Sequence, residues 1–240
     1  LHVGHALPLM ILSLFQRRGH DINFIVGDFT ARIGDPSGRS DRRRELSTSD
    51  ITRNMKHYVR NVSSLIDTKR AHVHRNSKWL SKTPLAEFFN VLSAVSFGEV
   101  AQREDFRNRL KSGIGVSMRE ANYSTLMSID SMELNVDIEV GAIDQLLNFM
   151  HTRGIMSARG MRPETLLMTP ILEGTAGDGR KMSKSFNNYI VLDAPAEKQF
   201  GLLMSIPDRL IKSYFLGFGD IREDEVEDLD RFIQKEPLEA

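Results

Sequence analysis

Two spacings of apolar residues alternate along this chain, and each predicts one kind of element. Apolar residues three and four positions apart predict amphipathic helices, whereas short continuous apolar runs predict buried strands. The predicted helices cover residues 6–18, 50–66, 118–134, 197–206, 208–218 and 223–234, with a further helix beginning near Leu146. The predicted strands cover residues 22–26, 71–74, 137–140 and 166–169. This alternation predicts an α/β fold with a parallel sheet, followed by a small α-helical segment.

Several of these elements carry signals at their ends. Gly19 follows the first helix, and Ser47 and Ser49 precede the second as candidate caps. The stretch 27–38, GDFTARIGDPSG, is dense in glycine, proline and aspartate, so we expect a loop there. Residues 84–110 are apolar in helix-like runs, which fits either ordinary core or a contact between subunits.

Composition excludes several classes of protein. The 240 residues are 40% hydrophobic and 27% charged, as in ordinary globular domains. There is no cysteine, so neither a disulfide framework nor a thiolate metal site can form. The most apolar stretch, residues 6–15, is too short to cross a bilayer and lacks the preceding basic residues of a secretory signal. We therefore expect a cytoplasmic protein that does not associate with membranes.

Charge is unevenly distributed, although the formal net charge is zero. Residues 1–82 contain 15 Lys or Arg against 7 Asp or Glu, whereas residues 220–240 contain 3 against 9. The basic part could meet phosphate groups, and solvated surface explains it equally well.

The basic loop GDGRKMSKS at residues 177–185 carries the strongest chemical signal. Glycine and aspartate favour a loop, and Lys181 and Lys184 with Ser183 between them can grip a polyphosphate from several sides. A second signal, HVGH at residues 2–5, precedes a predicted helix whose first N–H groups can receive a phosphate. For either motif alone, a solvated surface loop or a pair of stray histidines is as good an explanation as a nucleotide site. Together, in this order, they predict a nucleotide site at the carboxyl ends of the strands.

The two motifs resemble the signature pair of class I aminoacyl-tRNA synthetases, HxGH and KMSKS. Further segments stand in the order found in tyrosyl-tRNA synthetases of the bacterial type: HVGH, GDFTARIGDPSGR, NSKW, the helix with Tyr123 and Asp130, VGAIDQ, LLMTPILEG, GRKMSKS and MSIPD. The tryptophan enzymes share HxGH, KMSKS and a Gly-x-Asp-Gln element, but the GDPSGR loop is similar to the tyrosine branch. The resemblance covers essentially the whole chain and implies a Rossmann-like class I catalytic core.

The resemblance also implies two sets of ligand-binding residues. Those implied for tyrosine are Thr30 in the pocket wall, Asp35 and Tyr123 at the α-ammonium group, Asp130 at the phenolic hydroxyl and Gln145 on the carboxylate side. Those implied for ATP are His2, Gly4, His5, Gly141, Asp144 at a ribose hydroxyl, Lys181, Met182, Ser183 and Lys184. Of these, Lys181, Lys184, His2 and His5 are the implied catalytic residues, because they can stabilise charge on the departing pyrophosphate.

The implied reaction is the activation of L-tyrosine. Tyrosine and ATP would give tyrosyl-adenylate and pyrophosphate, and the tyrosyl group would pass to the 3′ end of tRNA(Tyr). Such chemistry needs alignment and charge stabilisation rather than a covalent enzyme intermediate. Mg²⁺ is implied as the companion of ATP, held mainly by phosphates, and no residue is assigned as its ligand. The family further implies a homodimer, for which residues 88–100 are our candidate interface.

The resemblance implies a catalytic domain at residues 1–193, with a helical insertion at about 83–117, and a helical segment at 194–240. The chain does not begin with Met and starts inside a motif, so we expect it to be a fragment of a longer protein. The family's strand before HxGH and its C-terminal RNA-binding domain are expected to lie outside this chain.

Two positions depart from the family pattern. Met127 stands where the family usually carries a glutamine that contacts the substrate, and Ala142 replaces the second glycine of Gly-Gly-x-Asp-Gln. A paralogue that adenylates another amino acid therefore remains one alternative. A non-catalytic relative that binds RNA is a second alternative, motivated by the basic part of the chain.

Overall fold

The computed structural model describes residues 1–35 and 47–219, together with residues 225, 228 and 231. The chain divides into two compact units, which we describe separately. The terminal unit joins Leu1–Ile11 to Thr169–Ala240, and the central unit comprises Leu12–Met168. Helix α1 (Ala6–Arg17) begins in the first of these and ends in the second. The boundary predicted between residues 193 and 194 falls inside the terminal unit, and those domain limits stay a prediction.

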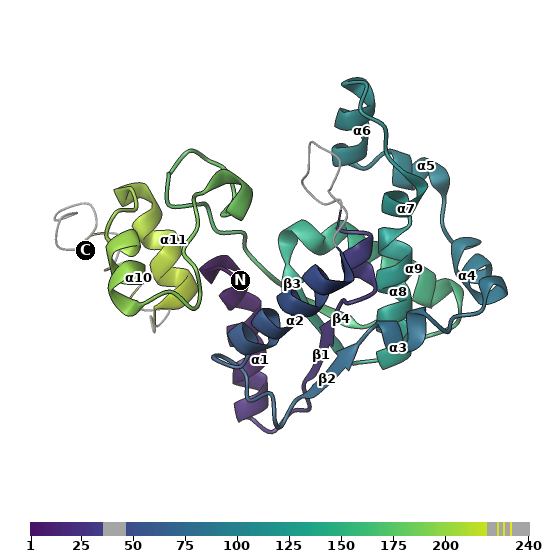
Figure 1. The fold of residues 1–240 in the computed structure, drawn as a ribbon, viewed down its shortest axis with the longest axis horizontal. Helices are drawn as coiled ribbons and strands as arrows, with labels where there is room; N and C mark the ends of the chain where they lie inside the picture. Colours follow the sequence, from purple (N-terminus) through teal and green to yellow (C-terminus); the bar gives the residue numbers. More distant parts are fainter. Residues whose placement is uncertain (36–46, 220–224, 226–227, 229–230, 232–240) are drawn as a thin grey trace. The chain divides into compact units, whose positions relative to one another are not determined.

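Two pairs of strands form the sheets of the structure (Figure 1). β1 (Asn23–Val26) pairs in parallel with β2 (His72–Arg75), and β3 (Ile138–Ala142) pairs with β4 (Thr165–Thr169). The register of the first pair sets Asn23 opposite His72, Phe24 opposite Val73, Ile25 opposite His74 and Val26 opposite Arg75. Each strand begins and ends within two residues of its predicted limits, so the four strands are confirmed.

Most of the helices belong to the central unit. They are α2 (Thr48–Val62), α3 (Ser77–Leu80), α4 (Leu85–Leu92), α5 (Phe97–Ala101), α6 (Glu104–Lys111), α7 (Met118–Ala121), α8 (Tyr123–Leu134) and α9 (Leu146–Ala158). Short 3₁₀ turns lie at Thr30–Arg32 and Ile143–Gln145. The predicted cap of α2 is confirmed, because the Ser47 hydroxyl accepts a hydrogen bond from the Asp50 N–H at 3.1 Å.

Two predicted helices differ from those observed. The helix expected over residues 118–134 is interrupted at Asn122, which leaves helical geometry at ψ 7° while its side chain donates to the Met118 carbonyl at 2.7 Å. The helix expected to reach Ile66 ends at Val62. Ser63 and Ser64 follow it, and their hydroxyls bond back to backbone carbonyls at 2.7 Å, in competition with continued helix.

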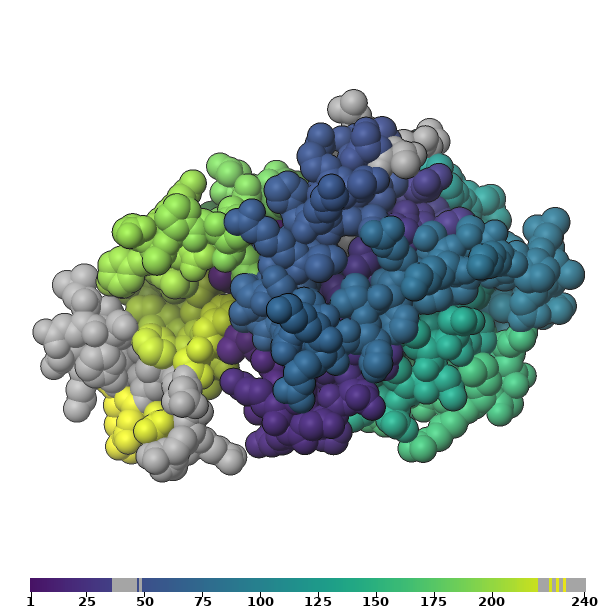
Figure 2. All heavy atoms as spheres, turned by 60° about the horizontal axis from the view of Figure 1, so that its bottom comes forward, coloured from purple at the N-terminus to yellow at the C-terminus, as the bar shows by residue number. Residues whose placement is uncertain are grey.

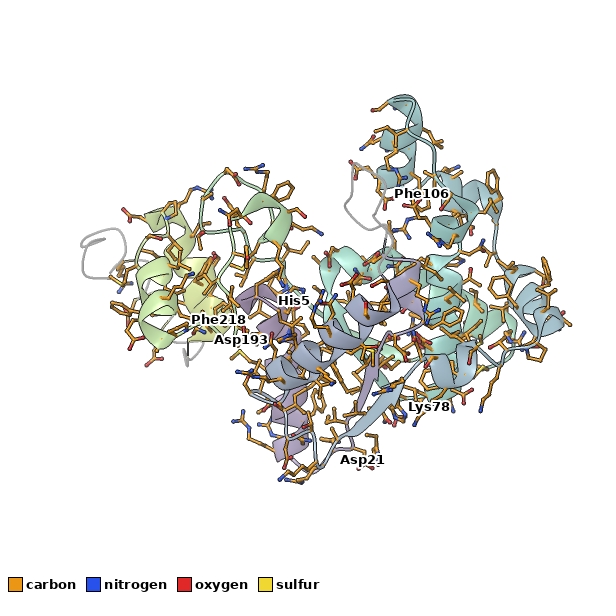
Figure 3. The ribbon with its side chains drawn as sticks, in the orientation of Figure 1. His5, Asp21, Lys78, Phe106, Asp193 and Phe218 are labelled. Atoms are coloured by element: carbon orange, nitrogen blue, oxygen red, sulfur yellow. The ribbon has the colours of Figure 1, made fainter. Side chains whose placement is uncertain are left out.

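α8 and α9 lie side by side and form the centre of the central unit (Figure 1). The apolar cluster around them consists of Leu80, Val91, Leu126, Ile129 and Ile155, with Phe29, Ile33, Trp79, Phe88, Val95 and Met132 against it. α6, which carries Phe106 (Figure 3), is joined to α7 by a buried ion pair between Arg109 and Glu120 at 2.9 Å.

The terminal unit contains η1 (Val3–His5), η4 (Lys184–Phe186), α10 (Ala196–Leu203) and α11 (Asp208–Phe218). The predicted helix at 208–218 is thus confirmed at both ends, and the one at 197–206 is three residues shorter at its end. The acidic helix predicted at 223–234 lies mostly outside the described residues. The core consists of Leu7, Leu172, Met182, Ile190, Leu210 and Tyr214, with Phe218 (Figure 3) among the side chains against it. Within the described residues, no helix has the length and apolarity needed to span a bilayer.

Candidate functional site

The lysine loop, residues 173–188, is held from inside by Asn188, whose side chain is 1% exposed. Its Nδ2 donates to the Lys181 carbonyl at 3.2 Å, and its Oδ1 accepts from the Ser183 N–H at 2.8 Å. A Cβ at Gly174 would stand 2.1 Å from the same Nδ2, so only glycine fits beside the amide. The backbone of Lys181-Met182-Ser183 is therefore fixed on both sides of the buried methionine.

The outer side of the lysine loop is fixed by Glu173. Its carboxylate accepts from Arg209 Nη1 at 2.8 Å and from the Gly179 N–H at 2.6 Å, while its carbonyl accepts from the Tyr214 hydroxyl at 2.8 Å. Gly177 and Gly179 both have positive φ, at +63° and +79°, which favours glycine. These contacts connect the loop to α11.

The HVGH motif packs against this loop. The Val3 N–H donates to the Ile190 carbonyl at 2.9 Å, and His2 forms an antiparallel bridge with Val191. A Cβ at Gly4 would stand 3.1 Å from the His2 ring and 3.8 Å from Met182 Sδ. Because Gly4 has no side chain, the HVGH backbone can lie close to the His2 ring and to Met182 of the lysine loop.

His2 lies in a cationic setting. Burial lowers its pKa to about 3, and the positive charges of His5, the N-terminal amine, Lys184 and Lys181 act in the same direction. The ring centroids of His2 and His5 (Figure 3) are 3.8 Å apart. The buried Nδ1 of His2 has no hydrogen-bond partner among the described residues. A neutral imidazole with an unsatisfied nitrogen, near two lysines, suits an anionic ligand with polar oxygens.

A second group of predicted site residues lies in the central unit around Asp130, which is 7% exposed. Its carboxylate accepts from Trp79 Nε1 at 2.7 Å and from Asn76 Nδ2 at 3.0 Å. Burial raises the pKa of Asp130 to about 6, the two donors act against this rise, and the charge of Asp28 adds to it. The result is an oriented carboxylate inside the protein.

Asn76 connects Asp130 to Thr30. The same Nδ2 donates to the Thr30 hydroxyl at 3.0 Å, and the Asn76 Oδ1 accepts from the Phe29 N–H at 3.0 Å. A Cβ at Gly27 would stand 2.5 Å from Thr30 Oγ1, so the glycine after β1 makes room for this hydroxyl. Predicted residues from the first loop and from α8 therefore meet through one buried amide.

Gln145 and Asp35 also meet, since Gln145 Nε2 donates to the Asp35 carboxylate at 2.8 Å. The Gln145 oxygen accepts from Asn148 at 2.8 Å, and Asn148 in turn accepts from Arg103 Nη1 at 2.7 Å. This chain of bonds orients the amide of Gln145 from α9.

The remaining predicted residues of the central unit lie in α8, in β3 and in the turn after β3. Tyr123 begins α8, seven residues before Asp130, with Met127 between them on the same face; both Tyr123 and Met127 are half-buried. A Cβ at Gly141 would overlap the Phe149 ring at 2.5 Å, so β3 passes close to α9 there. Ala142 ends β3 and Asp144 lies in the following turn, and both are half-buried.

The structure thus brings predicted residues together within each unit; in the central unit the contacts join Thr30 to Asp130 through Asn76, and separately Asp35 to Gln145. Convergence of all of them on one crevice stays a prediction. Sequence reasoning missed Asn188, and it quoted Asn76 and Trp79 only as part of NSKW. The available signal for Asn76 was its place directly after a predicted strand. Among the described residues, no group of three or more His, Cys, Asp or Glu side chains could hold a metal ion.

Comparison with known proteins places this arrangement in a family. The profile of tRNA synthetases class I (W and Y) matches residues 1–240. The tyrosine–tRNA ligase of Thermotoga maritima is 38% identical over 239 residues, which is 99% of this chain and 59% of that protein. That of Carboxydothermus hydrogenoformans is 39% identical over 214 residues, 89% of this chain and 52% of that protein. The chain therefore spans a little over half the length of these relatives.

Solved structures share the fold. The tyrosyl-tRNA synthetase of Archaeoglobus fulgidus, solved with L-tyrosine, aligns with a TM-score of 0.76 at 21% identity, over 99% of this chain and 78% of that one. The tryptophanyl-tRNA synthetase of Campylobacter jejuni, solved with ADP and tryptophan, aligns with a TM-score of 0.67 at 16% identity, over 96% and 75%. These likenesses confirm the predicted Rossmann-like α/β class. With its HVGH motif packed on the KMSKS loop and a profile match over its whole length, this chain belongs to the class I tRNA synthetases of the tryptophan and tyrosine type.

Proposed function

We propose that this chain carries the catalytic core of a tyrosine–tRNA ligase. It would activate L-tyrosine with ATP to tyrosyl-adenylate and pass the tyrosyl group to the 3′ end of tRNA(Tyr). The observation that carries the proposal is the contact of HVGH with the lysine loop: Val3 packs against the cluster that contains Met182, and a Cβ at Gly4 would stand 3.8 Å from Met182 Sδ. The 36–39% identity to curated tyrosine–tRNA ligases supports the same reaction.

ATP would bind to the terminal-unit group, where Gly4 admits the nucleotide and the lysine loop takes the phosphates. Lys181 and Lys184 would stabilise the charge of the departing pyrophosphate, with His2 and His5 as further hydrogen-bond donors. Met182 and Ser183 set the loop backbone, and Gly141 and Asp144 would contribute the ribose side. Mg²⁺ would enter with the phosphates, which supply most of its ligands.

Tyrosine would bind to the central-unit group. Asp130, oriented by Trp79 and Asn76, would accept the phenolic hydroxyl. Asp35 and Tyr123 would hold the ammonium group, and Gln145 would face the carboxylate side. Thr30 would line the pocket. A buried acceptor left without a hydroxyl partner disfavours phenylalanine, which gives the site its selectivity.

The test is amino-acid-dependent exchange of label between pyrophosphate and ATP, with tyrosine, phenylalanine and tryptophan compared. We expect exchange with tyrosine only. Lys181→Ala combined with Lys184→Ala should reduce the exchange rate by at least about 100-fold, since each lost charge–phosphate contact is worth roughly 1.5–3 kcal/mol. Tyrosine affinity, measured separately by calorimetry, should stay unchanged. If none of the three amino acids supports exchange although tyrosine still binds, the non-catalytic relative is favoured.

Altered specificity is the second candidate, because Met127 offers no polar bond where the family usually has glutamine. Exchange supported better by another amino acid than by tyrosine would establish this candidate.

We further propose that the protein works in the cytoplasm as a homodimer and that tRNA(Tyr) is its macromolecular substrate.

A further inference from the structure

Arg103 is a charged side chain that the central unit keeps largely out of water. Most lysine and arginine side chains of this unit are exposed, as are those of α2, whose residues appear in dark blue on the face in view in Figure 2. The side chains of Arg103 and its ion-pair partner Asp105 are each 11% exposed. Arg103 Nε and Nη2 donate to the Asp105 carboxylate at 3.3 and 3.2 Å. Removing two charges from water costs solvation free energy, so the ion pair alone does not explain an arginine at this position.

The local structure holds Arg103 in one place. Its N–H donates to the Val100 carbonyl at 3.3 Å, and its own carbonyl accepts from the Arg107 N–H at 2.8 Å, so the backbone is fixed where α5 ends and α6 begins. The guanidinium carbon lies 5.0 Å from the centre of the Phe106 ring (Figure 3), which is 2% exposed. Carboxylate and ring therefore orient the guanidinium group, and its Nη1 reaches α9.

A row of three hydrogen bonds leads from this Nη1 to the amino-acid residues of the candidate site. Arg103 Nη1 donates to Asn148 Oδ1 at 2.7 Å, and Asn148 is fully buried, at 0% exposed. Asn148 Nδ2 donates to Gln145 Oε1 at 2.8 Å. Gln145 Nε2 donates to Asp35 Oδ2 at 2.8 Å. We call this row the amide relay, and its members are Arg103, Asn148, Gln145 and Asp35.

The two ends of the amide relay give it a direction. The guanidinium group of Arg103 offers donors only, and the carboxylate of Asp35 offers acceptors only, whereas each amide between them has one side of either kind. Only one orientation of the two amides therefore satisfies all three bonds. If the Gln145 amide turned over, its oxygen would face the Asp35 carboxylate and the two groups would repel. Bonds that run in one direction also polarise one another, which strengthens the row as a whole.

We propose that Arg103 is a positioning residue for amino-acid binding. It fixes the orientation of the Gln145 amide through Asn148, and Gln145 in turn fixes the carboxylate of Asp35. The inference rests on the proposed function, in which Gln145 and Asp35 face the tyrosine to be activated. Arg103 acts through Gln145 and makes no contact with the substrate itself, so its removal should weaken the use of tyrosine and leave the use of ATP unchanged.

The first test compares the KM for tyrosine and the KM for ATP in pyrophosphate exchange between the parent chain and Arg103→Met. Methionine keeps an apolar side chain beside Phe106 and removes the donors. We expect the KM for tyrosine to rise about tenfold or more, as for one lost hydrogen bond from a charged donor, and the KM for ATP to stay within about twofold. Arg107→Met is the matched control, because Arg107 is exposed and lies one turn further along the chain, and it should behave like the parent.

A double-mutant cycle separates positioning from general stabilisation. In a Gln145→Met background the amide relay is already broken, so adding Arg103→Met should change the KM for tyrosine by less than about twofold. An arginine with a purely structural role would give the same fold-change in both backgrounds. Nuclear magnetic resonance of the Gln145 side-chain N–H groups, identified by their absence in Gln145→Met, gives a second readout without ligand. These signals should shift in Arg103→Met and stay in place in Arg107→Met.

Three results would overturn the inference: an unchanged KM for tyrosine in Arg103→Met, an equal rise in both backgrounds, or Gln145 signals that do not move. Calorimetric titration with tyrosine keeps the proposed function apart. If the parent binds tyrosine but supports no exchange, the ligase assignment fails, and the inference stands if Arg103→Met still binds tyrosine about tenfold more weakly. A parent that neither binds tyrosine nor supports exchange would overturn both.

Discussion

Asp130 is a buried carboxylate with two donors, and its chemistry decides what the proposed tyrosine pocket accepts. Trp79 and Asn76 favour its ionised form, whereas burial raises its pKa to about 6. At neutral pH the group is therefore a charged acceptor, and charged acceptors form the stronger hydrogen bonds. A phenol would add a third hydrogen bond to this carboxylate, whereas the phenylalanine ring has no donor to offer it.

We expect Asp130→Asn to reduce the preference for tyrosine over phenylalanine by about 10- to 100-fold, because one charged hydrogen bond is worth roughly 1.5–3 kcal/mol. Tyrosine affinity of the parent should also fall as the pH drops through 6, where the carboxylate becomes protonated. Calorimetric titrations between pH 5 and 8 measure both effects. Phenylalanine is the internal control, since it cannot make this bond. A parent whose tyrosine affinity shows no step near pH 6 would contradict the assignment.

Glu139 on β3 faces a second buried carboxyl group. Burial raises the pKa of Glu139 to about 7, Glu164 raises it further, and the Ser131 hydroxyl, 3.0 Å away, acts in the opposite direction. Glu164 is 2% exposed, and apart from Glu139 it has no hydrogen-bond partner among the described residues. Below pH 7 the Glu139 carboxyl group is protonated, and above pH 7 it adds a buried negative charge beside the second carboxyl group.

Glu139 should therefore contribute most to the free energy of unfolding below about pH 4.5, the usual pKa of a glutamate. This contribution should be lost as the pH rises through 7. Glu139→Gln keeps a donor for Glu164 without the second charge. We expect this variant to be more stable than the parent at pH 8 by about 1–3 kcal/mol, and to lose the advantage near pH 5. Urea unfolding, followed by the fluorescence of Trp79, the one tryptophan of the chain, measures it. Glu133→Gln, an exposed change on α8, is the control and should show no such pH dependence.

The lysine loop depends on a residue that lies at its far end. Asn188 bonds to the backbone at Lys181 and Ser183, so its removal leaves an N–H and a carbonyl without partners. We expect Asn188→Ala to raise the KM for ATP in pyrophosphate exchange about tenfold or more, at roughly 1–3 kcal/mol per unsatisfied group. Tyrosine binding should be unaffected.

Asn187→Gly is the matched control for that change. Asn187 is exposed with φ +51°, a backbone conformation that glycine adopts readily, so exchange should stay near the parent level. If both variants have equal effects, general loosening of the loop explains the data and the Asn188 contacts do not.

The sequence alone predicts those elements that depend on local patterns, and it does not predict contacts between distant residues. β1, α1, α9 and α11 follow from apolar spacing, because each has buried apolar residues on one side. The break at Asn122 is decided by a side chain competing for a backbone carbonyl, which apolar periodicity does not report. Asn76 lies 54 residues from Asp130, so their hydrogen bond depends on tertiary folding and no local pattern predicts it. The motifs identified Thr30, Asp35, Asp130 and Gln145 as candidate residues, and folding supplies the amide of Asn76 that joins Thr30 to Asp130.

At the scale of the whole molecule, the proposed homodimer needs an apolar surface, and residues 88–100 were the predicted interface. Large apolar side chains are exposed there and just before it: Leu85 at 71%, Phe89 at 59% and Phe97 at 72%. Exposed phenylalanine costs free energy in water, and covering it on association would recover roughly 1.5–3 kcal/mol for each fully buried side chain.

A charged residue at this surface should therefore separate the subunits. We expect the parent to sediment at twice its chain mass of 27.2 kDa and Phe97→Asp to sediment at that mass itself. Phe200→Asp on α10 is the matched control, because Phe200 is 65% exposed but lies in the terminal unit, and this variant should remain a dimer. Sedimentation velocity at several concentrations distinguishes the outcomes. If Phe200→Asp dissociates and Phe97→Asp does not, the contact between subunits lies on the terminal unit, and the exposed phenylalanines of α4 and α5 serve another purpose.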